Sequence, residues 1–177
     1  MSILMKNILR FVLLILMQFY VFDKVHLHYM VTPYIYFLFI VWMPFQLNRT
    51  VQMLLAFLLG FVLDSFRHSP GFHAAACVFI AYIRPFLINI LIPQEGADTN
   101  YDEPSVKSMG GFLPYMLYAG ILTFIHHGWL FLLEAWHFGN FWYFIVKTLL
   151  STIVSLLLIV ITEMLFSRKQ KFKTNTA

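Results

Sequence analysis

An aspartate stands at the end of an apolar stretch in GFVLDSFRHSPGFHAA, which runs from residue 60 to residue 75. This carboxylate, Asp64, follows Ala56 and Gly60 at intervals of four residues, so the three residues share one face of a helix. Small residues at this spacing allow a second helix to approach closely. The carboxylate could therefore cap the following turn or pair with a nearby cation, or it could hold a ligand or a partner.

A turn follows this carboxylate directly. Ser69, Pro70 and Gly71 are typical turn residues, and we expect them to reverse the chain into the next helix at the external boundary of the membrane. Arg67 and His73 flank the turn and are the candidate charge partners of the carboxylate. A tight hairpin held by the carboxylate and a site for a ligand or partner are the two interpretations of this motif.

A second charged candidate lies deeper in the membrane. Arg84 shares a helix face with His73 and lies about 18 Å below the start of their helix, at a rise of about 1.5 Å per residue. A charge at this depth is costly unless it is paired or reaches the interface. Glu163 lies at a matching depth in the last helix, and we predict an ion pair between it and Arg84. A functional charge and a side chain that snorkels to the cytoplasmic interface are the alternatives.

The other polar residues form no catalytic or metal-binding pattern. The neighbours His126 and His127 point about 100° apart on a helix, so they cannot both face one metal ion. The sequence contains no H-E-x-x-H motif, its serines have no motif that would supply a base, and its single cysteine, Cys77, cannot form a disulfide within the chain. We therefore expect no catalytic residues, no metal ion and no cofactor.

The composition indicates where these residues lie. Of the 177 residues, 60% are hydrophobic and 11% are charged, whereas about a quarter of the residues in a soluble domain are charged. A membrane-spanning helix needs about 20 mostly apolar residues. Segments that meet this need predict an all-α integral membrane bundle of six transmembrane helices, at 7–22, 29–46, 50–66, 72–92, 110–134 and 140–166.

The basic residues predict the orientation of this bundle. Lys6 and Arg10 lie at the inner end of the first span, which we interpret as a retained helix rather than a cleaved signal peptide, and the tail at 167–177 is basic. Positive residues favour the cytoplasmic side, so we expect both termini there. The acidic segment 93–109 is then a flexible, solvated cytoplasmic loop within the transmembrane domain, residues 1–166. No feature points to a nucleic-acid partner.

The hairpin motif resembles the rod-shape-determining protein MreD family. In that family a helix ending in glycine and aspartate is followed by a turn of a small residue, proline and glycine; Gly60, Asp64, Ser69, Pro70 and Gly71 match this pattern. The resembling stretch covers about residues 54–85. Phe61-Val62-Leu63 departs from the leucine usual in the family, and the face of His73 and Arg84 is not a family feature.

The resemblance implies a non-enzymatic, multi-pass protein of the bacterial inner membrane that acts in lateral cell-wall elongation. It would bind the single-span protein MreC and, with it, MreB filaments and the glycan polymerase and transpeptidase, among membrane lipids. The family is similar in fold to the substrate-binding subunits (S-components) of energy-coupling-factor transporters. That similarity supplies the alternative function, a transporter subunit that binds a small molecule or a lipid in an external pocket, lined by Asp64, His73, His126 or His127 and by the tryptophans at the external helix ends.

Overall fold

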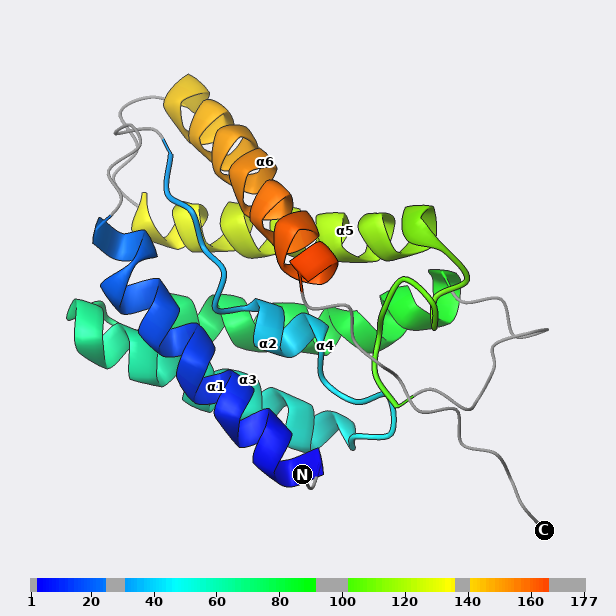
Figure 1. The fold of residues 1–177 in the computed structure, drawn as a ribbon. Helices are drawn as coiled ribbons and strands as arrows, with labels where there is room; N and C mark the ends of the chain where they lie inside the picture. The colour runs from blue at the N-terminus through cyan, green and yellow to red at the C-terminus, as the bar shows by residue number, and fades with distance from the viewer. Residues whose placement is uncertain (1–2, 25–30, 92–101, 136–140, 166–177) are drawn as a thin grey trace, which may run out of the picture.

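The computed structural model describes residues 3–24, 31–91, 102–135 and 141–165, and its regular structure there is helical (Figure 1). Five stretches are long and apolar enough to cross a membrane. They consist of α1 (Ile3–Tyr20) with the short helix η1 (Phe22–Lys24), α3 (Arg49–Arg67), α4 (Phe72–Leu91), α5 (Phe112–Glu134) and α6 (Phe141–Leu165). The predicted all-α membrane bundle is confirmed.

The prediction of a continuous helix at 29–46 is wrong. Its described part, from residue 31 onward, contains only the four-residue helix α2 (Leu38–Val41), between irregular backbone on both sides. Every residue from Tyr34 to Met43 is nevertheless buried. An apolar run gives the same sequence signal whether it forms a helix or a buried irregular strand, which is why the pattern was misleading.

This irregular segment, residues 31–47, runs through the length of the bundle, as the light-blue and cyan trace in Figure 1 shows. At one end, the backbone N–H of Thr32 bonds to Ser151 of α6. At the other end, the backbone N–H of Phe45 bonds to the carbonyl oxygen of Asp102, 2.9 Å away. The segment therefore crosses the bundle without forming a membrane-length helix, and we call it the crossing segment.

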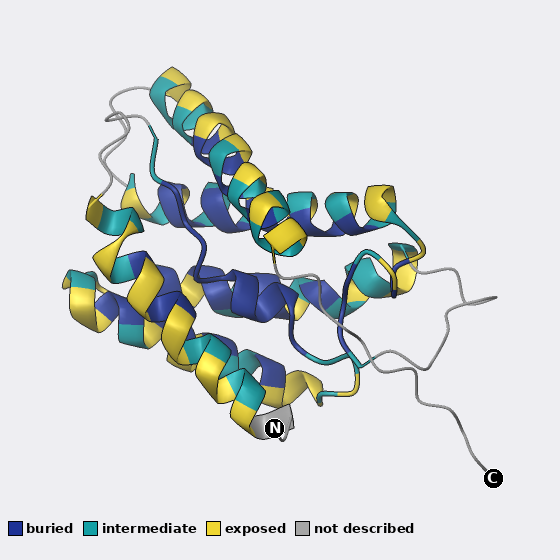
Figure 2. Cartoon of the chain, viewed as in Figure 1, coloured by how far each residue is buried: buried dark blue, intermediate teal, exposed yellow. Residues whose placement is uncertain are grey.

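The crossing segment forms the centre of the molecule, and the long helices surround it. Figure 2 shows buried residues along the segment and on the inward faces of the helices, with exposed residues on the outward faces. The outward faces carry large apolar side chains, for example Leu54, Phe61 and Leu157, each more than half exposed. Apolar outer faces match a lipid environment, whereas non-helical backbone is tolerated at membrane depth only when protein surrounds it.

The acidic loop differs from its prediction where it is described. Residues 92–101 lie outside the described part, but Glu103 is 5% exposed and forms ion pairs with Lys6 (3.3 Å) and Arg10 (2.8 Å) of α1. Ser105 and Ser108 are also buried and bond to each other. A solvated linker is therefore wrong for this part of the loop. The contacts place it at the same end of the bundle as the start of α1.

Candidate polar site at the hairpin of helices α3 and α4

The turn between α3 and α4 has a conformation that its residues favour. His68 ends α3 in the left-handed region, with φ of 54°, and its backbone N–H bonds to the carbonyl oxygen of Asp64. The backbone N–H of Ser69 bonds to the same carbonyl oxygen. Gly71 has φ of 96°, a value that costs glycine little because it has no Cβ atom. The chain thus reverses within a few residues and starts α4 at Phe72.

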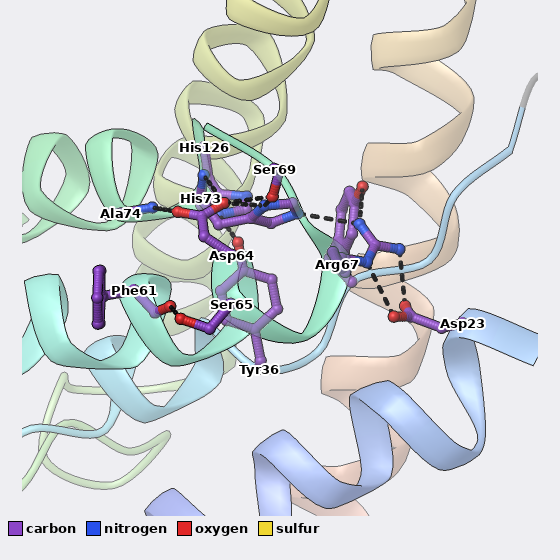
Figure 3. A network of polar contacts seen from close by, with 11 residues as sticks. Asp23, Tyr36, Phe61, Asp64, Ser65, Arg67, Ser69, His73, Ala74 and His126 are labelled. Atoms are coloured by element: carbon purple, nitrogen blue, oxygen red, sulfur yellow. Dashed lines mark hydrogen bonds and ion pairs between the residues drawn. The ribbon is translucent and has the colours of Figure 1, made fainter. Parts of the chain in front are cut away.

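Asp64 holds both sides of this turn, as Figure 3 shows. Its Oδ2 accepts the backbone N–H of Ala74 at 2.8 Å, and its Oδ1 accepts the backbone N–H of His73 at 3.1 Å. Oδ1 also accepts the hydroxyl of Ser69 at 2.6 Å and lies 2.8 Å from Nδ1 of His73. The carboxylate at the end of α3 therefore caps the first turn of α4, which is the first of the two roles expected from the sequence.

The small-residue face of α3 packs against α4 of the same chain. Ala56 and Gly60 are buried, and a Cβ atom on Gly60 would overlap the backbone of His73 and Ala74. Close approach of the two helices therefore requires glycine at this position. The second helix that approaches this face is therefore α4 of the same chain, and the face is not open to a partner helix.

His73 connects Asp64 to a second charged pair. Nη1 of Arg67 lies 2.9 Å from Nε2 of His73, and the guanidinium also binds Asp23 through two bonds of 2.8 Å. Arginine only donates, so Nε2 of His73 accepts and its Nδ1 carries the proton that faces Asp64. Arg67 also donates to the hydroxyl of Tyr34 at 2.9 Å. The network thus ties α3 and α4 to η1 and to the crossing segment.

This geometry differs from that of a serine–histidine–aspartate triad. In a triad, the serine and the aspartate bind opposite nitrogens of the histidine. Here Ser69 and Asp64 both lie on the Nδ1 side of His73, and Arg67 occupies the Nε2 side. The hydroxyl of Ser69 is also committed to the carboxylate. The arrangement therefore orients backbone and side chains, and it does not present an activated serine.

The two central histidines also serve the crossing segment. Nδ1 of His127 donates to the carbonyl oxygen of Thr123, so its Nε2 accepts the hydroxyl of Ser155, 3.1 Å away. Ser155 in turn accepts the backbone N–H of Tyr34. His126 bonds to the hydroxyl of Tyr36 at 2.8 Å. The adjacent histidines therefore act through different partners, and each one reaches the crossing segment.

The predicted ion pair between Arg84 and Glu163 is wrong. The buried Arg84 donates to the hydroxyl of Tyr118 at 2.9 Å, to Oε1 of Gln52 at 3.0 Å and to the carbonyl oxygen of Met43. Glu163 accepts the hydroxyl of Tyr115, 3.1 Å away. The pair was predicted only because the two residues lie at a similar depth in the membrane. The sequence pattern did not show that an irregular segment would offer the carbonyl oxygen of Met43 to Arg84.

Several polar residues that the sequence analysis did not select hold the same segment. Gln18 of α1 donates to the carbonyl oxygen of Pro33 and accepts the backbone N–H of Ile35. Ser151 and Ser155 accept two further backbone N–H groups of the crossing segment. Buried backbone groups without a partner are costly in lipid, so these side chains replace the bonds that a helix would have made internally. The four-residue spacing of the two serines on one face of α6 was the available signal.

Two cavities open on the outer surface beside the hairpin. An apolar groove of about 560 Å³ runs between α3 and α4, with Gly71 of the turn and Ala74, Ala75 and Val78 of α4 along it and Trp129 of α5 at its side. A smaller, more polar pocket of about 350 Å³ is lined by the hairpin itself, from Phe61 to Gly71. His73, His126 and His127 line neither cavity, although the expected small-molecule site would have used them.

Within the described ranges, no group of three or more histidine, cysteine, aspartate or glutamate side chains could hold a metal ion. Three of the seven histidines, His26, His28 and His137, lie outside those ranges. The basic tail at 167–177 also lies outside them. Comparison of the chain with protein-family models, with curated protein sequences and with solved structures finds no match.

Proposed function

We propose that this multi-pass membrane protein is a non-enzymatic scaffold. The observation that supports the proposal most is that the buried histidine side chains bond to other residues of the same chain. His73 is 1% exposed and His126 and His127 are fully buried, and all three bond to other residues of the chain. Polar groups arranged in this way fix a shape, whereas a site for a small molecule directs several of them into one cavity.

The sequence resemblance suggests which assembly this scaffold serves. The residues of the MreD-like motif, Gly60, Asp64, Ser69, Pro70 and Gly71, are the ones that set the α3–α4 hairpin. We therefore assign the protein to the cell-wall elongation complex of the bacterial inner membrane. In this proposal it binds MreC and, through it, MreB filaments and the glycan polymerase and transpeptidase.

An affinity purification from the native membrane tests this proposal. The tagged full-length protein is extracted in a mild detergent, and the proteins that accompany it are identified by mass spectrometry. The proposal predicts recovery of MreC and wall-synthesis enzymes. Recovery of ATPase subunits without wall proteins would instead support the transporter alternative, and recovery of neither group would contradict the scaffold assignment.

Two glycine variants show whether partner binding depends on the hairpin. Gly60→Ala forces α3 and α4 apart because the space beside Gly60 is filled by the backbone of Ala74. Gly120→Ala is the matched control, since a Cβ atom there would lie 3.9 Å from Leu156, an ordinary contact distance. We expect the first variant to lose the wall proteins and the control to retain them. Equal recovery from both would contradict a role for the hairpin.

A further inference from the structure

The start of α2 does not follow the preference of its local sequence. In the structure α2 begins at Leu38, and the residue at its N-cap, Phe37, makes no capping hydrogen bond through its side chain. Thr32 and Pro33 stand earlier in the chain. Threonine is a favoured N-cap residue, and proline is favoured at the first position of a helix. Residues 32–35 nevertheless have no regular structure, so the crossing segment contains a helix start that the fold does not use.

Side chains of α1 and α6 occupy the backbone donors of that unused helix start. The N–H of Tyr34 donates to Oγ of Ser155 at 3.1 Å. The N–H of Ile35 donates to Oε1 of Gln18 at 2.9 Å. In a helix that begins at the proline, these would be the second and third N–H groups, and the hydroxyl of Thr32 would accept one of them. Gln18 and Ser155 therefore take the place of a local cap.

Gln18 also binds an acceptor that the longer helix would need. Its Nε2 donates to the carbonyl oxygen of Pro33 at 3.2 Å. In a helix this oxygen would accept the N–H of Phe37, four residues later. The bonds from Gln18 and Ser155 thus form only while residues 33–35 are irregular. A contact that is made in one conformation and lost in the other selects the first of them.

Tyr34 connects this part of the segment to the α3–α4 hairpin. Its hydroxyl accepts a hydrogen bond of 2.9 Å from Arg67. A helix rises about 1.5 Å per residue and an extended chain about 3.3 Å, so winding three residues shifts the backbone by up to about 5 Å. Arg67 cannot follow such a shift, because two bonds of 2.8 Å hold its guanidinium on Asp23. Winding would therefore break the bond between Tyr34 and Arg67.

We propose that the crossing segment switches between two lengths of α2. The contacts of Gln18 and Ser155 hold the shorter helix, and their release lets α2 extend back to Pro33, with Thr32 as its cap. Tyr34 then leaves the hairpin network, so the positions of α1 and α6 are transmitted to α3 and α4. The switch uses only contacts within the chain and does not rest on the proposed scaffold function.

Solid-state NMR of the full-length protein in bilayers tests the proposal. Ile35–Tyr36 is the only isoleucine–tyrosine pair in the sequence. Labelling with ¹³C-isoleucine and ¹⁵N-tyrosine therefore isolates the signal of Ile35. Its carbonyl and Cα chemical shifts distinguish a helix from irregular backbone. We expect irregular shifts in the wild type.

A variant of α1 should produce the longer helix. Gln18→Leu removes the bonds to Pro33 and Ile35 and keeps a side chain of similar size, so we expect the signal of Ile35 to move to helical shifts. Thr152→Val is the matched control, because this buried hydroxyl bonds to the carbonyl oxygen of Thr148 in its own helix. It should retain the wild-type shifts. The same shifts in both variants would overturn the proposal.

Two further variants apply the same measurement. Ser155→Ala removes the bonds to Tyr34 and His127 and leaves Gln18 in place, so it serves even if Gln18→Leu does not fold. We expect helical and irregular signals side by side. Thr32→Val, added to Gln18→Leu, removes the cap and should restore irregular shifts. A single irregular signal from Ser155→Ala, or helical shifts that persist without the threonine, would overturn the switch.

Thermal stability measures the link to the hairpin. Tyr34→Phe removes the hydroxyl that accepts the bond from Arg67, so it should lower the melting temperature of the wild type by several degrees. In a Gln18→Leu background that bond is already broken, and the same change should have little effect. An equal loss in the two backgrounds would overturn the link between α2 and the hairpin.

Discussion

Asp64 accepts four hydrogen bonds from the turn and from the first residues of α4. We predict that Asp64→Ala lowers the free energy of unfolding by about 2 kcal/mol, because a helix cap is lost and buried donors remain without an acceptor. Ser65→Ala is the control, since this exposed hydroxyl bonds only to the carbonyl oxygen of Phe61 in its own helix. Chemical denaturation in detergent measures both variants. A loss of equal size in the two would contradict the capping role.

Arg84 provides a second prediction for single residues. Its removal in Arg84→Met leaves Gln52, Tyr118 and the carbonyl oxygen of Met43 without this donor, and we expect a loss of about 3 kcal/mol in the free energy of unfolding. A double-mutant cycle with Gln52→Ala should give a coupling energy of about 1 kcal/mol. A cycle with Glu163→Gln should be additive within about 0.5 kcal/mol. Strong coupling between Arg84 and Glu163 would contradict the structure and support the ion pair that was predicted from the sequence.

At the scale of elements, the helix pair α3 and α4 depends on one glycine. Gly60→Ala places a Cβ atom against the backbone of His73 and Ala74, which cannot move aside as a side chain can. We predict a clear loss of thermal stability for this variant. Gly128→Ala is the control, because its Cβ atom would lie 3.9 Å from a methyl group of Thr148. Melting curves followed by size-exclusion fluorescence compare the two, and equal melting temperatures would contradict the close approach.

The elements that the sequence predicted well are those with a strong local pattern. The hairpin could be predicted because Gly60, Asp64 and the Ser69-Pro70-Gly71 turn act through neighbours close in the chain. The long helices could be predicted because each is a long apolar run. In these cases local sequence and final structure agree, and the pattern was sufficient.

The crossing segment could not be predicted in the same way. Residues 34–43 are as apolar as a membrane helix, but they are surrounded by protein, and the backbone N–H groups at their start bond to side chains from distant parts of the chain. Gln18 and Ser155, for example, reach this backbone from α1 and α6. Such contacts are long-range, so a local pattern does not report them. The sequence analysis predicted the wrong partner for Arg84 for the same reason, because the contact of Arg84 with the carbonyl oxygen of Met43 is long-range.

At the scale of the whole molecule, the crossing segment determines which loops share a side of the membrane. Because this segment crosses the bundle, the start of α1 and the loop before α5 lie at the same end, as the ion pairs of Lys6 and Arg10 with Glu103 require. The α3–α4 turn lies at the opposite end. If the segment did not cross, α3 and the helices that follow it would have the opposite orientation relative to α1. The loop before α5 would then lie on the opposite side of the membrane from the start of α1, and the α3–α4 turn on the same side as that start.

The sidedness of three engineered cysteines tests this arrangement most directly. In a Cys77→Ala background, Lys6→Cys, Lys107→Cys and His68→Cys are labelled separately with a membrane-impermeant maleimide, in intact cells and in inverted membrane vesicles. We predict that Lys6→Cys and Lys107→Cys react in inverted vesicles and that His68→Cys reacts in intact cells. Labelling of positions 6 and 107 from opposite sides would contradict the crossing segment and, with it, the structural role assigned to the interior polar residues.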